Sequence, residues 1–230
     1  MSIGIIGAMR IEVEELKSRM KNIKVDRISQ MEFYTGELFG KEAVVAVSGV
    51  GKVNAAMCAQ TMILKYNPEI IINTGVAGGI AKGVRIGDVV IGKAVVQHDM
   101  DTSALGDPVG LISGINVVEI PCTELVVEKL KKAAENIENL NIYTGTIATG
   151  DQFINSNEQS NLIAERFNAM ACEMEGGSIG QVCYINGVDF AIVRAISDNG
   201  DDESHMDFEE FVRLAAKNSI EMMTNFLATV

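Results

Sequence analysis

The sequence predicts an α/β fold, and three observations carry this prediction. Short, β-branched apolar runs alternate with longer stretches of 3.6-residue periodicity, which is the pattern of strands interleaved with helices. Of the 230 residues, 47% are apolar and 22% are charged, so the chain can bury a sizeable core without disulfide or metal support. No linker, low-complexity tract or internal repeat divides the chain, and we therefore expect residues 1–230 to form a single domain.

The first half of the chain is interpreted from its apolar spacing and its turn residues. Short β-rich apolar runs predict strands, and apolar residues repeated every three to four positions predict helices. Glycines and Pro68 mark boundaries between these elements. The elements expected here are a strand over residues 2–9, a helix over 11–21, paired strands over 32–38 and 42–48, a helix over 53–66 and a strand over 69–74.

The second half continues the alternation after one long irregular stretch. Residues 98–121 hold most of the turn residues, and loops of this length in compact domains tend to be functional. Asp207, three residues before Glu210, resembles a capping box at the start of the last helix. The elements expected here are strands over residues 86–97, 142–148, 169–174 and 189–196, and helices over 123–137, 175–185 and about 208–227.

The charge balance and the cysteines exclude several classes of function. The net charge is −12 and no basic block is present to follow a phosphate backbone, so nucleic acid is not an expected partner. No apolar run reaches the roughly 18 residues that span a bilayer, and no cationic flank of a signal peptide is present. We therefore expect a cytoplasmic protein without a membrane partner. The four cysteines form no C-x-x-C pair, and we expect them to be reduced packing residues.

Motifs for nucleotide, metal and serine chemistry are incomplete. The loop at residues 48–52 resembles half of a dinucleotide fingerprint, but Asn54 stands where the third glycine belongs. Val53 stands where a phosphate-binding Walker loop needs Ser or Thr. His98 and His205 are the only histidines and lack metal-ligand spacing, so we expect no metal site. No G-x-S-x-G elbow is present for a serine hydrolase.

Glycines and acids at the expected strand ends are the candidates for a site, because ligands of α/β sheets usually bind there. The glycines of residues 74–79 would let a ligand approach the backbone, although tight turns explain them equally well. Acids stand at the ends of three distant segments, namely Glu12, Glu173 with Glu175, and Asp198. Converging carboxyl groups suit glycosidic cleavage, in which one protonates the leaving group and another activates water. Solvated surface charges, or charges favoured at helix N-termini, are the alternative interpretation.

Five short motifs follow one another at these strand ends. They are GIIGAMRIE at residues 4–12, SGVGKV at 48–53, NTGVAGG at 73–79, CEME at 172–175 and VRAISD at 193–198. Through them the chain resembles the 5′-methylthioadenosine/S-adenosylhomocysteine nucleosidase family over nearly its whole length. The resemblance implies a nucleoside phosphorylase-like fold, with a central mixed twisted sheet curled toward a barrel and flanked by helices. It also implies hydrolysis of the adenine–ribose bond of methylthioadenosine and S-adenosylhomocysteine, without a metal or an organic cofactor.

The resemblance further implies a role for individual residues. Glu12 would activate water, and Asp198, oriented by Ser197, would protonate N7 of the purine so that adenine leaves neutral. Glu175 would hold the ribose hydroxyls. The other implied contacts are Met174 against the sugar with Arg194 nearby, Phe153 stacked on adenine, the Ile154 backbone at the purine edge, and Met9, Val50 and Phe208 around the 5′-alkylthio group.

Two parts of the chain depart from the family pattern. Val76 stands in the implied substrate site where many relatives carry serine. Leu105 and Asp107 stand where aromatic residues often occur. The resemblance implies a homodimer in which the segment around Leu105 completes the pocket of the neighbouring subunit. Because of these departures, the sequence predicts cleavage of a nucleoside more firmly than a preference for an alkylthio group at the 5′ position.

Other functions stay open from the sequence. Arg10 and Arg85 fit a purine nucleoside phosphorylase, because phosphate capture needs cations near the ribose. A carboxylate at Glu12 would repel phosphate and favours water as the nucleophile. A hydrolase of a related adenine or 6-substituted purine nucleoside is a further alternative. A nucleoside-binding protein without catalysis would need neither Glu12 nor Asp198.

Overall fold

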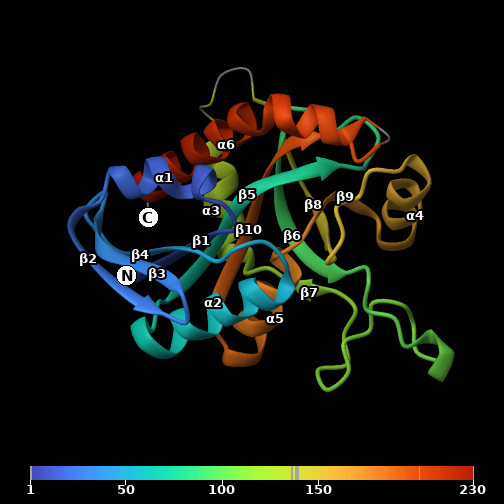
Figure 1. Ribbon diagram of the computed structural model, residues 1–230, viewed down its shortest axis with the longest axis horizontal. Coiled ribbons are helices and arrows are strands. Elements are labelled where there is room, and N and C mark those ends of the chain that lie inside the picture. Colours follow the sequence, from blue (N-terminus) through green and yellow to red (C-terminus); the bar gives the residue numbers. More distant parts are fainter. Residues whose placement is uncertain (1, 136, 138–139, 202, 230) are drawn as a thin grey trace.

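A single large sheet organises the molecule. The computed structural model describes residues 2–135, 137, 140–201 and 203–229. Within these residues ten strands join one sheet, and helices cover both of its faces (Figure 1). The α1, α3 and α6 helices pack together on one face, and α2 and α5 pack together on the other. The predicted α/β class with a mixed sheet is confirmed; residue 136 of the helix expected over 123–137, and residue 202, lie outside the described residues.

One part of the sheet closes into a ring, as the family resemblance implied. The ring runs from β5 to β10, β6, β8 and β9 and returns to β5. Strands β1, β4, β3 and β2 extend outward from β5 in that order, and β7 pairs with β6. The bounds are β1 Ser2–Gly7, β2 Lys21–Ile28, β3 Met31–Leu38, β4 Lys41–Val47, β5 Ile70–Gly79, β6 Val89–Gln97, β7 Ile120–Pro121, β8 Ile142–Thr149, β9 Ala169–Glu173 and β10 Asp189–Asp198.

The predicted helices form, with ends that differ by a few residues, and the core fills the space between them and the sheet. The helices are α1 Arg10–Ser18, α2 Lys52–Tyr66, α3 Glu124–Ala134, α4 Asn157–Phe167, α5 Gly176–Asn186 and α6 Ser204–Thr229, with a short 3₁₀ turn, η1, at Ser103–Leu105. The four cysteines are buried and free, as packing residues are. None of the helices in the described residues is both long enough and apolar enough to cross a membrane.

Besides the short β7 and η1, two longer elements were not predicted, because they lack an apolar pattern. Strand β2 is almost entirely exposed at the edge of the sheet, so its sequence shows no alternation of buried and exposed residues. Helix α4 is largely polar and buries Ser160, Ile163 and Phe167. Neither stretch gives the periodic signal on which the sequence interpretation depends.

Two predicted boundaries are wrong. Residues 75–79 do not form a loop but continue β5, because their backbone pairs with β10 and β9. Helix α6 begins at Ser204, so Asp207 and Glu210 lie inside it and form no capping box. Asp201 supplies the start instead, since its side chain accepts a hydrogen bond from the backbone N–H of Glu203 at 3.0 Å.

The arrangement of strands brings distant segments to one place. Strands β1, β5 and β10 are parallel to one another, so their carboxyl ends meet at one edge of the sheet. The end of β9 reaches the same edge, because Cys172 pairs with Gly78 of β5. Residues that follow or end these strands therefore gather around one space.

Candidate active site

A cavity of about 390 Å³ lies at the carboxyl ends of these strands. Its wall combines carboxyl groups with apolar and sulfur-containing side chains. The predicted site residues that line it are Met9, Glu12, Val50, Val76, Phe153, Met174, Glu175, Ser197, Asp198 and Phe208. Segments far apart in the sequence thus share one cavity.

Other residues of the wall had no predicted role in binding or catalysis, although Glu173 and Gly78 were among the general candidates at the strand ends. They are Ala8, Ala77, Gly78, Cys172, Glu173, His205 and Glu209. Most of them stand inside the five sequence motifs, next to residues that were predicted. His205 and Glu209 have a different reason: they lie one turn apart on α6, and the predicted start of this helix came too late to show that they share a face with Phe208.

Two predicted contacts, Ile154 and Arg194, do not line this cavity. In the extended loop after β8, consecutive side chains point to opposite sides, so Phe153 faces the cavity and Ile154 is buried on the other side. There Ile154 lines a separate cavity of about 160 Å³ together with His98. Arg194 stands four residues before the end of β10 and is fully buried beneath the cavity wall.

The Glu12 carboxylate is held in the first turn of α1. Its Oε2 accepts a hydrogen bond from the backbone N–H of Met9 at 2.8 Å, which caps the helix. Its Oε1 accepts one from the backbone N–H of Val76 on β5 at 3.0 Å. Burial raises the pKa of Glu12, and Arg194 and these backbone donors partly oppose that rise. Glu12 is therefore a fixed carboxyl group with increased basicity.

Asp198 is the last residue of β10 and is held by local donors. Its Oδ1 accepts from the backbone N–H of Gly200 and its Oδ2 from the Ser197 hydroxyl, both at 3.0 Å. Burial raises the pKa of Asp198 despite these bonds, and the nearby Asp207 adds to the rise. The protonated form is therefore favoured more than in an ordinary aspartate.

The glycines of β5 make room for both acids. A Cβ atom on Gly75 would lie 2.5 Å from Glu12 Oε1, and a Cβ atom on Gly78 would lie 2.7 Å from Asp198 Oδ1. Neither glycine has a positive φ. Of the two explanations left open by the sequence, close approach applies at these positions, although the groups that approach are the chain's own carboxylates.

A third carboxylate, Glu175, belongs to a buried network. Its Oε1 accepts from the backbone N–H of Gly51 at 2.9 Å, and its Oε2 lies 3.8 Å from Arg194 Nη2. Burial, reinforced by the neighbouring Glu173, raises the pKa of Glu175 to about 7. Glu173 itself forms an ion pair with Arg194, and Asn73 also binds this guanidinium. One buried cation therefore serves two adjacent carboxylates.

The opposite part of the wall is apolar and aromatic. Phe153 is 45% exposed and meets Phe208 edge to face, with ring centroids 5.9 Å apart. Met9, Val50 and Met174 add flexible or branched apolar surface to the same cavity. Among the residues that the structure describes, no group of three or more His, Cys, Asp or Glu side chains could hold a metal ion. This combination suits a flat, partly apolar molecule with hydroxyl groups at one end.

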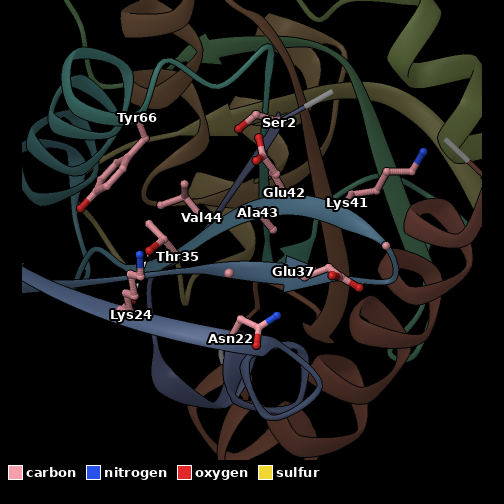
Figure 2. A pocket seen from close by; sticks show the side chains of 12 residues that line it. Ser2, Asn22, Lys24, Thr35, Glu37, Lys41, Glu42, Ala43, Val44 and Tyr66 are labelled. Atoms are coloured by element: carbon pink, nitrogen blue, oxygen red, sulfur yellow. Dashed lines mark hydrogen bonds between the residues drawn. The ribbon is translucent and has the colours of Figure 1, made fainter.

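A second cavity, of about 430 Å³, lies at the amino end of β1 (Figure 2). Ser2 is part of its wall, whereas the first cavity begins after the other end of β1. The side chains in Figure 2 come mainly from β2, β3 and β4 and carry both charges, such as Lys24, Lys41, Glu37 and Glu42. It contains none of the predicted site residues.

Comparisons with known proteins match almost the whole chain, including the residues of this site. A family model described as the phosphorylase superfamily matches residues 2–228. A 5′-methylthioadenosine/S-adenosylhomocysteine nucleosidase of Geobacillus thermodenitrificans is 42% identical over 231 residues, which cover 100% of this chain and 98% of the relative. A nucleosidase of the same name from Shewanella halifaxensis is 41% identical, covering 99% of each chain. The chain belongs to this nucleosidase family.

Solved structures give the same result for the fold. The methylthioadenosine/S-adenosylhomocysteine nucleosidase of Neisseria meningitidis, solved with methylthio-immucillin-A, superposes with a TM-score of 0.96 at 36% identity and covers 100% of this chain and 99% of that one. A futalosine hydrolase of Helicobacter pylori superposes with a TM-score of 0.95 at 33% identity, covering 100% and 98%. The nucleoside phosphorylase-like fold implied by the sequence motifs is confirmed.

Proposed function

We propose that this protein hydrolyses the N-glycosidic bond of 5′-methylthioadenosine and of S-adenosylhomocysteine, releasing adenine and the 5-alkylthioribose. The observation that carries the proposal is the pair of buried carboxyl groups, Glu12 and Asp198, in the wall of one partly apolar cavity. Membership in the nucleosidase family supports the same reaction. The proposed function uses only groups of the protein and water.

In the proposed mechanism, Glu12 and Asp198 divide the proton transfers. Asp198, with its raised pKa, donates a proton to N7 of the purine, so that adenine leaves as a neutral molecule. Glu12, fixed by two backbone donors, accepts a proton from the attacking water. Its negative charge also stabilises the ribosyl cation that forms as the bond breaks. A Helicobacter pylori relative with an aspartate-to-asparagine mutation has been solved with 5′-methylthioadenosine in its active site.

The ribose is assigned to the buried network. Glu175 accepts hydrogen bonds from the 2′- and 3′-hydroxyls, and Met174 packs against the sugar. Arg194 acts from beneath the wall, where its charge favours the ionised form of Glu175 and opposes the rise in pKa that burial causes. A contact between Arg194 and the substrate itself is not part of the proposal.

The base and the 5′ substituent are assigned to the apolar wall. Phe153 stacks on adenine, while the backbone of Ile154, whose side chain faces away, meets the purine edge. Met9, Val50 and Phe208 surround the alkylthio group. Val76 contributes its backbone N–H to Glu12, a bond that does not depend on the serine found in many relatives.

Hydrolysis is favoured over phosphorolysis by the position of the cations. Arg10 and Arg85 are absent from the described wall of the cavity, and Arg194 is engaged by Glu173 and Asn73. A phosphate ion in the cavity would therefore meet the Glu12 carboxylate without an unpaired Arg or Lys in the described wall.

We also propose an oligomeric state and a cellular location for this protein. The side chain of Leu105 is 84% exposed on η1, and we infer that this segment reaches the pocket of a second copy in a homodimer. An exposed leucine on a long loop fits such a contact. A cytoplasmic location is likewise proposed, in line with the nucleosidase family to which the chain belongs.

The test is incubation with methylthioadenosine, with and without phosphate, followed by identification of the sugar product. Adenine and free methylthioribose without phosphate are expected. Glu12→Gln and Asp198→Asn should each lower kcat by about 10²–10⁴-fold while the circular dichroism spectrum stays the same. A phosphate requirement with a ribose 1-phosphate product would make the protein a phosphorylase, and near-normal turnover in both variants would refute the assigned roles.

A further inference from the structure

A groove lies along the seam between α1 and α6, the two helices whose first turns contribute to the wall of the nucleoside cavity. It has a volume of about 790 Å³ and is lined by residues of both helices. Arg10 lines the groove and directly follows Met9, which lines the cavity. Arg213 lines the groove and lies one helical turn, about 5.4 Å, after Glu209, which lines the cavity. Each helix therefore carries one arginine of the groove next to a residue of the cavity wall or one turn beyond it.

The charges in this groove are not balanced. Its acids have their own partners, since Glu14 accepts from Lys17 at 2.8 Å and Glu15 pairs with Arg19. By contrast, in the part of the chain that the structure describes, no ion pair or hydrogen bond engages the guanidinium of Arg10 or of Arg213, and both side chains are exposed.

Other groups near Arg10 do not change this picture. Glu32 lies within electrostatic range of Arg10, but its carboxylate is bound by Arg27 and Tyr34. Lys217 is a further exposed cation in the groove, one turn beyond Arg213. In a chain with a net charge of −12, this is an unusual local excess of positive charge beside a ligand cavity.

The two proposed substrates differ only in the group bonded to the 5′ sulfur, which extends out of the cavity on the side of the groove. Methylthioadenosine ends in a methyl group on the 5′ sulfur. S-adenosylhomocysteine carries on that sulfur an amino acid with an α-carboxylate and an α-ammonium group. The sulfur is assigned to the part of the wall formed by Met9, which directly precedes Arg10 of the groove, and Phe208, which lies five residues before Arg213 on α6. Three carbon atoms separate the sulfur from the carboxylate, which is a reach comparable with one helical turn.

We propose that Arg10 and Arg213 bind the α-carboxylate of S-adenosylhomocysteine and thereby set the selectivity between the two substrates. Guanidinium groups bind carboxylates through paired, charge-assisted hydrogen bonds. Glu209, which lines the cavity one helical turn before Arg213, then faces the α-ammonium group. This inference rests on the proposed nucleosidase function and adds the residues that recognise one of its substrates.

The test compares kcat/KM for the two substrates in Arg10→Gln, Arg213→Gln and the double variant. The ratio of kcat/KM for S-adenosylhomocysteine to that for methylthioadenosine should fall about tenfold in the double variant, with smaller falls in the single variants. The matched control is Lys24→Gln, which removes one exposed positive charge beside the cavity of Figure 2 and should leave the ratio as it is. Added salt should lower the ratio in the wild-type protein more than in the double variant.

A second probe is S-adenosylhomocysteine without its carboxylate, the corresponding aminopropyl thioether. The wild-type protein should cleave this analogue as poorly, relative to methylthioadenosine, as the double variant cleaves S-adenosylhomocysteine. An unchanged ratio in a folded double variant would overturn the inference while cleavage of methylthioadenosine upholds the proposed function. If the wild-type protein releases adenine from neither substrate, the proposed function fails and this inference fails with it.

Discussion

Single residues decide whether the two acids can occupy the cavity. Gly75 and Gly78 lie in extended strand β5, where any residue could adopt the backbone conformation. Their missing side chains matter because the carboxylates of Glu12 and Asp198 occupy the space that a Cβ atom would need. A glycine that serves close approach is sensitive to alanine, the smallest substitution available.

We expect Gly78→Ala to lower kcat for methylthioadenosine by at least about 100-fold, because the new methyl group displaces the Asp198 carboxyl group from the position where it donates its proton. The rate of adenine release measures this effect. The control is Gly40→Ala, in open space at a positive φ, which should cost about 1–3 kcal/mol of stability without lowering kcat. Equal kcat in both variants would contradict the explanation.

Glu175 gives a pH dependence at the same scale. Its carboxylate accepts hydrogen bonds from the ribose hydroxyls best when it is ionised. Its pKa is raised to about 7 in the folded protein from an ordinary value of 4.5. We therefore expect kcat/KM to fall as the pH drops below about 7, and Glu175→Gln to remove this inflection from the pH profile. The free energy of unfolding should show the opposite trend with pH. Because the folded protein binds this proton more tightly than the unfolded chain, the contribution of Glu175 to stability falls as the pH rises from about 4.5 to 7. If the profile of kcat/KM against pH keeps the same inflection in Glu175→Gln, the assignment of this inflection to Glu175 is refuted.

At the scale of elements, the junction between β9 and α5 holds the site together. Glu173 ends β9 and accepts hydrogen bonds from the backbone N–H groups of Glu175 and Gly176, at 3.1 and 2.7 Å, where α5 begins. The same carboxylate pairs with Arg194 of β10. One buried side chain thus connects two strands and a helix start, and it positions Glu175.

Replacing Glu173 with glutamine should therefore lower the free energy of unfolding by about 3–5 kcal/mol, because it leaves the buried Arg194 charge without its main partner. Urea denaturation measures this change. Glu128→Gln removes one partner of an exposed pair with Lys131 and should change stability by no more than about 1 kcal/mol. Similar values for the two variants would show that the Glu173 pair contributes little.

At the scale of the whole molecule, the closed ring of strands creates the site. Because β5 belongs both to the ring and to the extension through β1, it brings Val76 and the two glycines between the end of β1 and the end of β10. The proposed second copy would add to this wall through the exposed segment around Leu105.

Light scattering at micromolar concentration should therefore give twice the mass of one chain. Leu105→Ala should lower kcat/KM for methylthioadenosine about tenfold by removing an apolar contact, without changing the mass. Leu125→Ala is the matched control, since Leu125 is 66% exposed on α3, and it should leave kcat/KM unaffected. A monomeric mass would refute the dimer and the proposed contact together.

Local sequence patterns predicted those parts of the molecule that depend on local physics. Buried strands such as β1 and β10 were found because their apolar runs must be removed from water, and α2 because its periodicity and Pro68 mark its extent. Strand β2 and helix α4 were missed because polar surface elements lack this signal. The start of α6 was misjudged because the hydrogen bonds of Asp201, and not those of Asp207, set it.

The sequence by itself determined the α/β class, the order of most elements and, through five motifs, the family and most residues of the cavity wall. Only the tertiary structure decided that residues 75–79 are strand, that Ile154 and Arg194 lie outside the wall, and that Glu173 anchors Arg194. The physical reason is that local patterns record which residues avoid water, whereas pairing between distant strands determines which side chains meet. Burial at that meeting point then raises the pKa values of Glu12, Glu175 and Asp198.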